Sequence, residues 1–309
     1  MKLIRRKYRS EDDYWAIRAF LREVFLLNGR RELCWPLYRW DYWRWHVNEN
    51  IFRFSLQAAV FLWETTGGRL AAVLHPEGPG EAFLQVHPAY RSAELEVEMM
   101  ATAETQFATM QPDGGHRLVL WAHEGDLLRR DLLARRGYTR GGHPEYQRRR
   151  CMDEPIPDFQ PAPGYTVRSL GDESELPARS WVSWRAFHPD EPDEKYEGWA
   201  WYRNVQAAPL YRRDLDLVAV APDGELAAFS TVWFDDVTRT AAFEPVGTHP
   251  AHQRRGLGKA IMAEGLRRVA RLGATLSAVG SYSEAAGALY ASAGFGEYEL
   301  SEPWVRREA

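Results

Sequence analysis

The chain contains an internal repeat, and this repeat constrains its fold more than any other feature of the sequence. Residues 68–73 (GRLAAV) recur as 224–229 (GELAAF), and residues 86–90 (VHPAY) recur as 248–252 (THPAH). Residues 136–138 (RGY) recur as 293–295 (AGF). The three landmarks keep the same order at an offset of about 160 residues, which is typical of duplicated structural units. The sequence therefore predicts two copies of one domain.

A proline-rich segment separates the two copies. The 309 residues suffice for about two domains of ordinary size. Four prolines fall within residues 152–164, where they disfavour a helix or a central strand and favour extended backbone. We therefore expect a first domain over residues 1–151, a linker over 152–164 and a second domain over 165–309. The basic run 148–150 is interpreted as a solvated strand end rather than a phosphate-binding patch.

Apolar runs and turn signals in the second copy predict strands and helices in alternation. Strands are expected at 165–170, 217–221, 226–234, 241–248, 276–279 and 295–304. Acidic residues at 172–175 open a helix that leads to His188, and the apolar spacing after Gly258 predicts a helix that Gly273 ends. A short helix is expected over 284–293. The fold class is therefore α/β, of the α+β type, with helices packed on a mixed sheet.

Charge and cysteine content exclude several classes of protein. The formal net charge is -4, from 39 Lys and Arg against 43 Asp and Glu, so no basic excess is available to bind a nucleic acid. Cys34 and Cys151 cannot form a disulfide framework and lack the spacing of a structural zinc site, which suits a reducing compartment. His188, His249 and the other histidines lack metal-ligand spacing and are interpreted as surface or loop residues. We expect no metal.

The N-terminal segment favours a cytoplasmic protein. Residues 1–7 are basic, but they lead directly into acidic residues without the apolar core of a secretory signal. No stretch of the sequence approaches the roughly 18 apolar residues of a membrane span. We therefore expect a soluble, cytoplasmic protein with no membrane partner.

The segment 253–259 (QRRGLGK) lies between an expected strand and an expected helix. A helix N-terminus exposes unpaired N–H groups and a positive partial charge, and glycines allow an anion to approach the backbone there. Arg254, Arg255 and Lys259 add formal positive charge. The segment therefore favours a pyrophosphate site, while a plain strand-to-helix turn with solvent-facing arginines is the alternative. Its spacing matches neither a dinucleotide-binding fingerprint nor a Walker loop.

Residues 253–258 resemble the Q/R-x-x-G-x-G/A acyl-CoA motif of the GNAT acetyltransferase superfamily. The context agrees, because a strand and Pro250 precede the motif, an amphipathic helix follows it, and residues 289–295 (LYASAGF) come later in that family's order. The resemblance covers about residues 165–304, and the first copy resembles the same fold more weakly. It implies two tandem GNAT-like acyl-CoA N-acyltransferase domains, acetyl-CoA as the acyl donor and an amine as the acceptor.

The resemblance also implies a set of residues that contact acetyl-CoA. In this family, free backbone N–H groups of the strand before the loop hold the pantetheine arm and polarise the thioester carbonyl. Pro245 suits such a strand, because a proline belongs at an edge or a bulge. The expected contacts are Val246, Gly247, Thr248, Arg254, Arg255, Gly256, Leu257, Gly258 and Lys259. Ser283 is added to them, although the family commonly has asparagine at its position.

Acyl transfer to an amine needs a base for the amine and an acid for the departing thiolate. Tyr290 occupies the position where the family has a tyrosine near the CoA sulfur, so it is the candidate acid. A buried tyrosine that only packs the helix is the alternative. Strand alternation places Glu244 on the same face as Val246, which makes Glu244 the candidate base. A water relay, with Glu244 as a structural carboxylate, is the alternative for the base.

The first copy departs from the acyl-CoA motif. When the two His-Pro landmarks are aligned, Glu94 and Glu96 stand in place of the two glycines, and carboxylates at a helix start would repel a pyrophosphate. Leu133 falls opposite the candidate acid, so the first copy lacks that group as well. We therefore expect residues 1–151 to form a degenerate copy that binds no CoA.

The acceptor is expected near aromatic and acidic residues of the second copy. The aromatic residues are Trp181, Trp184, Phe187, Trp199, Trp201 and Tyr202, and they surround the acidic segment 190–194. Both kinds of side chain favour a cationic group, while packing between the two copies is the alternative use of the aromatics.

The leading hypothesis is an N-acetyltransferase that transfers the acetyl group of acetyl-CoA to a primary amine of a small molecule or peptide. A non-catalytic CoA-binding or scaffolding protein of the same fold is the alternative. The fold alone does not select between them or name the acceptor, because one fold hosts many functions. The oligomeric state is left open.

Overall fold

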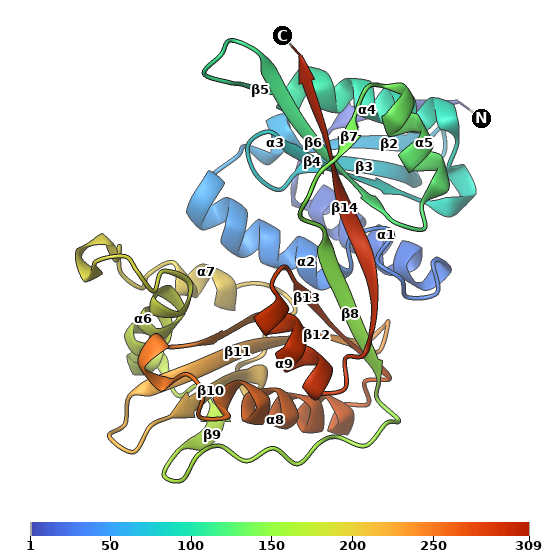
Figure 1. Ribbon diagram of the computed structural model, residues 1–309. Coiled ribbons are helices and arrows are strands. Elements are labelled where there is room, and N and C mark those ends of the chain that lie inside the picture. The colour runs from blue at the N-terminus through green and yellow to red at the C-terminus, as the bar shows by residue number, and fades with distance from the viewer. Residues whose placement is uncertain (1, 309) are drawn as a thin grey trace. The chain divides into compact units, whose positions relative to one another are not determined.

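The computed structural model describes residues 2–308 and has a mixed α/β architecture (Figure 1). The chain forms two compact units. The first unit comprises the chain up to Glu145 and again from Glu299 onward, and the second comprises Tyr146–Tyr298. Each unit has its own strands and its own buried apolar core, as expected for two copies of one domain.

The first unit is a mixed sheet covered by helices on both faces. Its helices are α1 (Glu11–Leu27), α2 (Leu37–Tyr42), α3 (Leu56–Ala59), α4 (Ala93–Phe107) and α5 (Leu127–Arg135). Its strands are β1 (Leu3–Lys7), β2 (Phe61–Thr65), β3 (Leu70–Pro76), β4 (Glu81–Val86), β5 (Thr109–Met110), β6 (His116–His123), β7 (Thr139–Arg140) and most of β14 (Glu297–Glu308). The order is β1-β2-β3-β4-β6-β14, with β5 paired to β6 and β7 to β14. Only the pair β4 and β6 is parallel among those described.

Alternation along the strands of the first unit sends side chains to two separate cores. Phe61 and Trp63 on β2 pack into the cluster that includes α4 and α5, while Leu62 packs into the cluster that includes α1 and α2. Successive side chains of a strand point to opposite faces, so the two clusters lie on opposite sides of the sheet.

The second unit repeats this plan. Its helices are α6 (Leu176–Phe187), α7 (Tyr202–Gln206), α8 (Leu257–Arg271) and α9 (Glu284–Ser292). Its strands are β8 (Glu145–Cys151), β9 (Thr166–Ser169), β10 (Asp216–Val220), β11 (Leu226–Asp235), β12 (Thr240–Thr248) and β13 (Leu276–Ser281), in the order β8-β13-β12-β11-β10-β9. Leu257, Ile261, Leu266 and Val269 form the buried face of α8, as their helical spacing predicts. The expected helices and strands of this copy are confirmed within a few residues.

The last strand of each sheet comes from the other half of the sequence. Strand β8, which ends the first half, pairs antiparallel with β13 of the second unit, from Cys151↔Leu276 to Tyr146↔Ser281. Strand β14, drawn red in Figure 1, pairs antiparallel with β6 of the first unit. The expected boundaries 1–151 and 165–309 are therefore corrected. The alternating pattern of these strands suits either sheet, and only long-range pairing decides which sheet a strand joins.

The segment 152–164 belongs to the second unit and is not a free spacer. Its Met152 N–H donates to Thr275 O at 3.1 Å, and its Ala162 N–H donates to Arg255 O at 3.0 Å. Phe159 packs against the core of the second unit. The expectation of a linker between the units is therefore corrected, because the second unit already begins before this segment.

The interpretation of residues 148–150 as a solvated strand end is wrong for Arg150. Its side chain is buried and donates to Ala293 O at 2.7 Å and to Glu154 O at 2.9 Å. Ala293 lies at the C-terminus of α9, where unpaired carbonyl groups favour a cation. Arg150 therefore closes the end of this helix.

The repeated landmarks have the same structural roles in both units. Gly68 and Gly224 have positive φ angles, of 80° and 93°, in the turns that join β2 to β3 and β10 to β11. His87 and His249 each accept a hydrogen bond from the backbone N–H two residues later, at the start of a single 3-10 turn. The repeat therefore reflects a shared fold.

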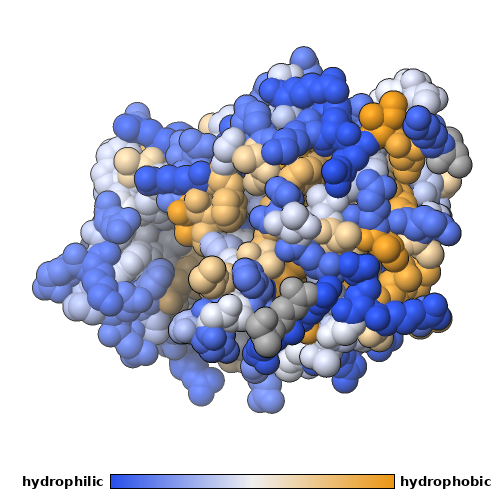
Figure 2. Space-filling model, turned by 90° about the horizontal axis from the view of Figure 1, so that it is seen from above, coloured by the Kyte–Doolittle hydropathy of each residue, from blue (hydrophilic) through white to orange (hydrophobic). Residues whose placement is uncertain are grey.

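The face of the molecule in Figure 2 is largely hydrophilic, with apolar side chains in patches between charged ones. Among residues 2–308, no helix is both long and apolar enough to cross a lipid bilayer.

Candidate functional site

Strands β12 and β13 separate along their length in the second unit. They pair in parallel only from Thr240↔Leu276 to Ala242↔Ala278, although β12 continues to Thr248 and β13 to Ser281. On its other side, β12 stays paired with β11 as far as Thr248. Within the described residues 2–308, the end of β12 therefore presents one backbone edge without a strand partner.

A bulge in β12 accompanies this separation. Ser230 pairs with Val246 and Val232 pairs with Phe243, so Thr231 stands opposite two residues, Glu244 and Pro245. The expectation that Pro245 marks a bulge is confirmed, since a proline has no N–H to donate to a ladder.

Backbone alternation decides which N–H groups face the open edge of β12. His249 N–H donates to Ala227 O at 2.9 Å, on the β11 side. In an antiparallel pair, every second residue has its N–H on the same side. Gly247 is therefore oriented like His249, while the N–H groups of Val246 and Thr248 are directed toward the open edge.

Gly247 contributes space instead of a donor. A Cβ atom at this position would lie 2.4 Å from Cζ of Phe229 and 3.0 Å from Cβ of Ala186. A larger residue would force Phe229 or helix α6 to move. The absence of a side chain at Gly247 therefore leaves space beside the open edge of β12.

The loop between β12 and α8 presents a run of unpaired backbone donors. The first backbone N–H of this region with a carbonyl acceptor is that of Ala260, which donates to Gly256 O at 3.0 Å. Among residues 2–308, no backbone or side-chain acceptor is recorded for the six N–H groups from Arg254 to Lys259. Arg254 and Gly256 have positive φ angles of 63° and 74°, and this folds the loop tightly over the helix start. These donors and the helix dipole form a site suited to an anion.

The three basic side chains of the loop differ in position. Arg254 and Lys259 line a cavity beside the loop, whereas Arg255 does not. The Arg255 guanidinium lies over the ring of Tyr165, 5.6 Å from its centroid. The formal charge that faces the cavity from this loop therefore comes from Arg254 and Lys259.

The cavity has a volume of about 920 Å³ and joins the open edge of β12 to the N-termini of α8 and α9. Such a volume lies at the upper end of the range for small-molecule and cofactor sites. It is lined by Ala186, Phe187, Val246, Gly247, Thr248, His252, Gln253, Arg254, Gly256, Leu257, Gly258, Lys259, Ser283, Ala285, Ala286, Ala288 and Leu289. Nine of the ten residues expected to contact acetyl-CoA, all except Arg255, therefore border one cavity.

Ser283 is the N-cap of α9. Its hydroxyl accepts a hydrogen bond from Ala286 N–H at 3.2 Å, so it satisfies one donor of this helix start. The side chain is exposed and borders the cavity.

Tyr290 and Glu244 interact electrostatically with one another. Burial raises the pKa of the Tyr290 hydroxyl above its usual value, and the negative charge of Glu244 raises it further. No hydrogen-bond partner of this hydroxyl is recorded within residues 2–308. Neither side chain lines the cavity itself. Tyr290 directly follows Leu289, which lines the cavity, and Glu244 lies two residues before Val246, which also lines it. Burial of Tyr290 is also what a purely packing tyrosine would show.

The first unit has a different arrangement at the corresponding helix starts. Helix α4 begins four residues after Pro88, at the N-cap Ser92, whereas the N-cap Gly256 comes six residues after Pro250. The loop is thus two residues shorter, and Glu94 rather than Glu96 has the helical position of Gly258. The alignment expected from the His-Pro landmarks is corrected at this point. The Ser92 hydroxyl accepts from Leu95 N–H at 3.2 Å, so the helix caps itself.

Glu96 lies inside a buried ion-pair network of the first unit. Its carboxylate accepts from Arg129 Nε at 2.9 Å and is also bonded to Arg91. Arg91 in turn binds Asp126, the N-cap of α5 and the counterpart of Ser283. These charged side chains join the starts of α4 and α5, whose counterparts in the second unit, the starts of α8 and α9, border the cavity.

The aromatic residues expected near the acceptor do not all lie at the cavity. Trp181, Trp184 and Tyr196 pack on one another, with the two tryptophan rings stacked 5.5 Å apart. Phe187, in contrast, is 54% exposed and lines the cavity beside Gly247. Phe187 is therefore the residue of this aromatic set that borders the cavity.

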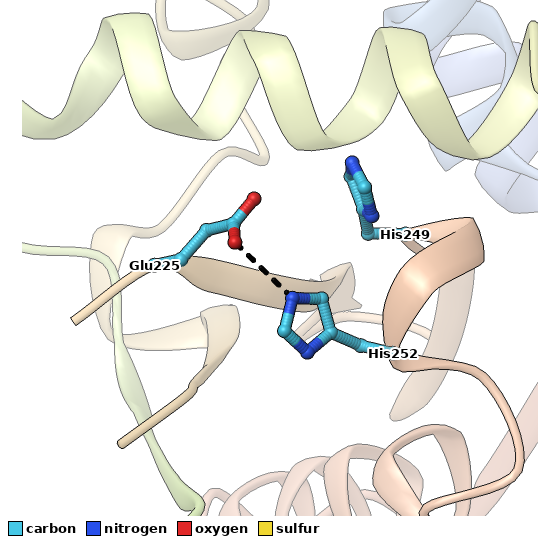
Figure 3. Close-up of side chains that lie close together, drawn as sticks. All are labelled: Glu225, His249 and His252. Atoms are coloured by element: carbon cyan, nitrogen blue, oxygen red, sulfur yellow. Dashed lines mark hydrogen bonds and ion pairs between the residues drawn. The ribbon is translucent and has the colours of Figure 1, made fainter. Parts of the chain in front are cut away.

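The interpretation of the histidines as surface or loop residues is wrong for His75 and His123, which are buried in strands β3 and β6. His252 does lie in a loop, at the end of the 3-10 turn Pro250–His252. This side chain is buried and lies between Tyr165 and Glu225, close to His249 (Figure 3). The spacing of three residues between His249 and His252 is the sequence signal for this cluster. Glu225 has no such signal, since it comes from a different turn.

The second copy is similar to one family of known proteins. Residues 176–295 match the family model for the acetyltransferase (GNAT) family. A mycothiol acetyltransferase of Kineococcus radiotolerans is 30% identical over 204 residues, which are 63% of this chain and 62% of that protein. The match thus spans less than two thirds of the relative's length. A mycothiol acetyltransferase of Streptomyces coelicolor is 25% identical over 252 residues, which are 75% of each chain.

Solved structures share the fold of the whole chain. A GCN5-related N-acetyltransferase from Sphaerobacter thermophilus superposes with a TM-score of 0.66 at 18% identity, covering 99% of this chain and 95% of that one. A tandem GNAT protein from the clavulanic acid biosynthesis pathway has a TM-score of 0.67 at 17% identity, covering 99% and 98%. At these identities the likeness concerns the fold, and it extends over both copies.

Proposed function

We propose that this chain is a member of the acetyltransferase (GNAT) family and that it transfers the acetyl group of acetyl-CoA to a primary amine through its second unit. The observation that carries the proposal is the run of six backbone N–H groups from Arg254 to Lys259, which have no acceptor among residues 2–308 and lie next to the open edge of β12. A pyrophosphate supplies the acceptors that this run lacks, and the open edge supplies donors for a thioester arm.

Two of the three glycines that line the cavity, Gly247 and Gly258, support this use of the site. A Cβ at Gly247 would meet Phe229, and a Cβ at Gly258 would lie 3.1 Å from Leu289. Both positions are therefore kept free of side chains where the cavity approaches the backbone. Arg254 and Lys259 offset the charge of a bound pyrophosphate.

The chemistry requires a nucleophilic amine and a protonated leaving group. The neutral amine attacks the thioester carbonyl, whose oxygen is stabilised by the N–H of Val246. Glu244 accepts the amine proton, either directly or through a water molecule. The C–S bond then breaks, and the Tyr290 hydroxyl donates its proton to the departing sulfur. A raised pKa suits this role, because the phenol keeps its proton at neutral pH.

A small-molecule acceptor is the first class to test. The relatives named mycothiol acetyltransferase support a small amine, and the exposed ring of Phe187 offers an apolar surface at the end of the cavity next to Gly247. The first unit is proposed to bind no acetyl-CoA, because its own ion pairs occupy the corresponding region.

Calorimetric titration with acetyl-CoA, followed by an assay of thiol release with a panel of amines, tests the proposal. The panel includes small primary amines, amino sugars, polyamines and a peptide with a free N-terminus. One equivalent of acetyl-CoA bound per chain and amine-dependent thiol release are expected. Tight binding without thiol release for any amine supports a non-catalytic CoA-binding protein instead.

A further inference from the structure

Glu225, His249 and His252 form a compact cluster on two tight turns of the second unit (Figure 3). One ligand atom from each side chain lies within 4.8 Å of the other two. Glu225 follows Gly224 in the turn between β10 and β11, and the two histidines stand at the ends of the 3-10 turn that follows β12. The cluster therefore joins two turns that are distant in sequence.

Backbone hydrogen bonds hold each of these turns in place. Ala221 N–H donates to Glu225 O at 2.9 Å, and Glu225 N–H donates to the Asp223 carboxylate at 3.1 Å. His252 N–H donates to His249 O at 2.9 Å. The three side chains therefore start from fixed backbone positions, which reduces the entropy lost when they bind a common ligand.

His252 is oriented by partners at both of its ring nitrogens. Nδ1 lies 2.9 Å from the Tyr165 hydroxyl, and Nε2 lies 3.2 Å from Glu225 Oε2. When Nδ1–H donates to the tyrosine oxygen, the Nε2 lone pair faces the carboxylate. Two lone pairs at that distance repel one another unless a proton or another cation lies between them. A cation in that position is bound by both His252 Nε2 and Glu225 Oε2.

The other copy of the repeat lacks this ligand set. The landmarks place Arg69, His87 and Tyr90 of the first unit at the positions of Glu225, His249 and His252. The Arg69 guanidinium lies over the Tyr90 ring, 5.9 Å from its centroid, and is paired with Glu23. A fixed positive charge thus replaces the carboxylate, and a phenol replaces an imidazole. Among residues 2–308, three groups that can bind a metal ion together occur only in the second unit.

We infer that Glu225, His249 and His252 form a binding site for one divalent transition-metal ion of the Zn²⁺ type. Two imidazole nitrogens and a carboxylate are the ligands that Zn²⁺ prefers when one position is left open to water. Ligand atoms about 2.1 Å from a tetrahedral ion lie about 3.4 Å apart, so the longer separations close by rotation of the exposed Glu225 side chain and of His249. Burial lowers the pKa of His249. Near this imidazole, Arg185 forms an ion pair with Asp193, and the charge of Arg185 lowers the same pKa while that of Asp193 raises it.

Metal binding has one local consequence for hydrogen bonds. Nδ1 of His249 accepts from Ala251 N–H at 3.2 Å. If the ion binds Nε2 of His249, the ring proton moves to Nδ1, which can then no longer accept from Ala251 N–H. If the ion binds Nδ1, the bond to the metal takes the place of this hydrogen bond. In either case the turn before Gln253 is held by the ion, next to the wall of the cavity that His252 lines.

Titration of the chelator-treated, dialysed full-length protein with ZnCl₂ tests the site. Calorimetry is expected to give one equivalent of Zn²⁺ per chain, and Co²⁺ is expected to show the visible absorption of a four-coordinate nitrogen and oxygen site. Glu225→Gln and His249→Ala are expected to weaken binding by more than 100-fold. Tyr165→Phe, which removes the hydroxyl that orients His252, is expected to weaken it by about 10- to 100-fold.

His188→Ala is the matched control, because it removes an exposed histidine outside the cluster. Glu225 lies on a surface turn, so Glu225→Gln tests the site without the risk of unfolding that a buried histidine carries. Stoichiometric binding that the Glu225 and His249 variants lose, and the His188 variant keeps, supports the site. Absence of stoichiometric Zn²⁺ binding, or binding unchanged in both cluster variants, overturns the inference and leaves a hydrogen-bonded cluster.

Discussion

Arg129 Nε donates to Glu96 Oε2 at 2.9 Å in the first unit, with both side chains buried. Arg91 extends this contact to Asp126 at the start of α5. In the second unit, the helix starts that correspond to these border a cavity of about 920 Å³. In the first unit, side chains of the chain itself bond to the helix starts. In the second unit, backbone N–H donors at the start of α8 are left for a ligand.

Glu96→Gln is expected to lower the free energy of unfolding by about 3 kcal/mol, because it leaves buried Arg129 without its main counter-charge. Urea unfolding followed by tryptophan fluorescence measures this change. Glu94→Gln, at an exposed position of the same helix, is the control and is expected to change stability by less than about 0.5 kcal/mol. Acetyl-CoA affinity is expected to stay the same in both variants. A loss of affinity in Glu96→Gln would point to a second site in the first unit.

Gly258→Glu gives α8 the residue that α4 has at the same helical position. A carboxylate about 5 Å from a pyrophosphate costs about 3 kcal/mol at an effective dielectric constant near 20, so acetyl-CoA affinity is expected to fall at least about 100-fold. Gly258→Gln has nearly the same size without the charge, and both variants must displace Leu289. Calorimetry is expected to show a clearly smaller loss for Gln. Equal affinities for the two variants would mean that charge at this helix start is irrelevant.

Tyr290→Phe is expected to reduce kcat by about 10²–10⁴-fold, because it removes only the proposed proton donor. No hydrogen bond is recorded for the hydroxyl among the described residues, so acetyl-CoA affinity and the thermal midpoint are expected to change little. The deficit is expected to shrink as pH rises, since a thiolate then leaves without a proton. Because the pKa of Tyr290 is raised, the wild-type enzyme is expected to keep this acid above the pH where an ordinary tyrosine ionises. Wild-type turnover in the Phe variant at all pH values would make Tyr290 a packing residue.

Gly247→Ala is expected to destabilise the protein by about 1–3 kcal/mol, because its Cβ would lie 2.4 Å from the Phe229 ring. Phe229→Leu removes the ring that the new methyl group meets. The double variant is therefore expected to be more stable than the sum of the two single changes predicts. Thermal or urea unfolding of the four proteins gives this coupling energy. Strict additivity would show that the contact between these two positions has no energetic role.

Glu81→Gln is expected to stabilise the first unit in a pH-dependent manner. Burial and the charge of Glu77 raise the pKa of the Glu81 carboxyl from 4.5 to about 7 in the folded state. As pH rises from about 4.5 to 7, the unfolded chain releases this proton before the folded chain does, so Glu81 lowers stability over this range. Above pH 7 the penalty reaches about 3 kcal/mol, and it vanishes below pH 4.5.

The glutamine variant keeps an oxygen that can accept the hydrogen bond from Trp121 Nε1. Urea unfolding at pH 8 is therefore expected to show a more stable variant, and unfolding at pH 4 is expected to show equal stabilities. A stability difference that is independent of pH would contradict the raised pKa.

Local patterns in the sequence predicted much of the second unit. The helix α8, the turn at Gly224 and the bulge at Pro245 depend on residues within a few positions of one another, which spacing and backbone preferences describe well. The run 253–259 likewise has its unpaired donors because of its own backbone conformation at a helix start. These features were visible in the sequence because their physical causes are local.

Contacts between distant segments were decided only by the tertiary structure. The pairing of β14 with β6 joins residues more than 150 positions apart, and no strand pattern selects one sheet edge over another. Two other contacts depend in the same way on which turns the sheet brings together. One is the contact of the Arg255 guanidinium with the Tyr165 ring, and the other is that of Glu225 with His252. The sequence by itself determined the repeated fold and the loop with unpaired backbone donors before α8, because both follow from short-range preferences. The exchange of the last strands and the cluster of Glu225 with the two histidines follow from long-range packing.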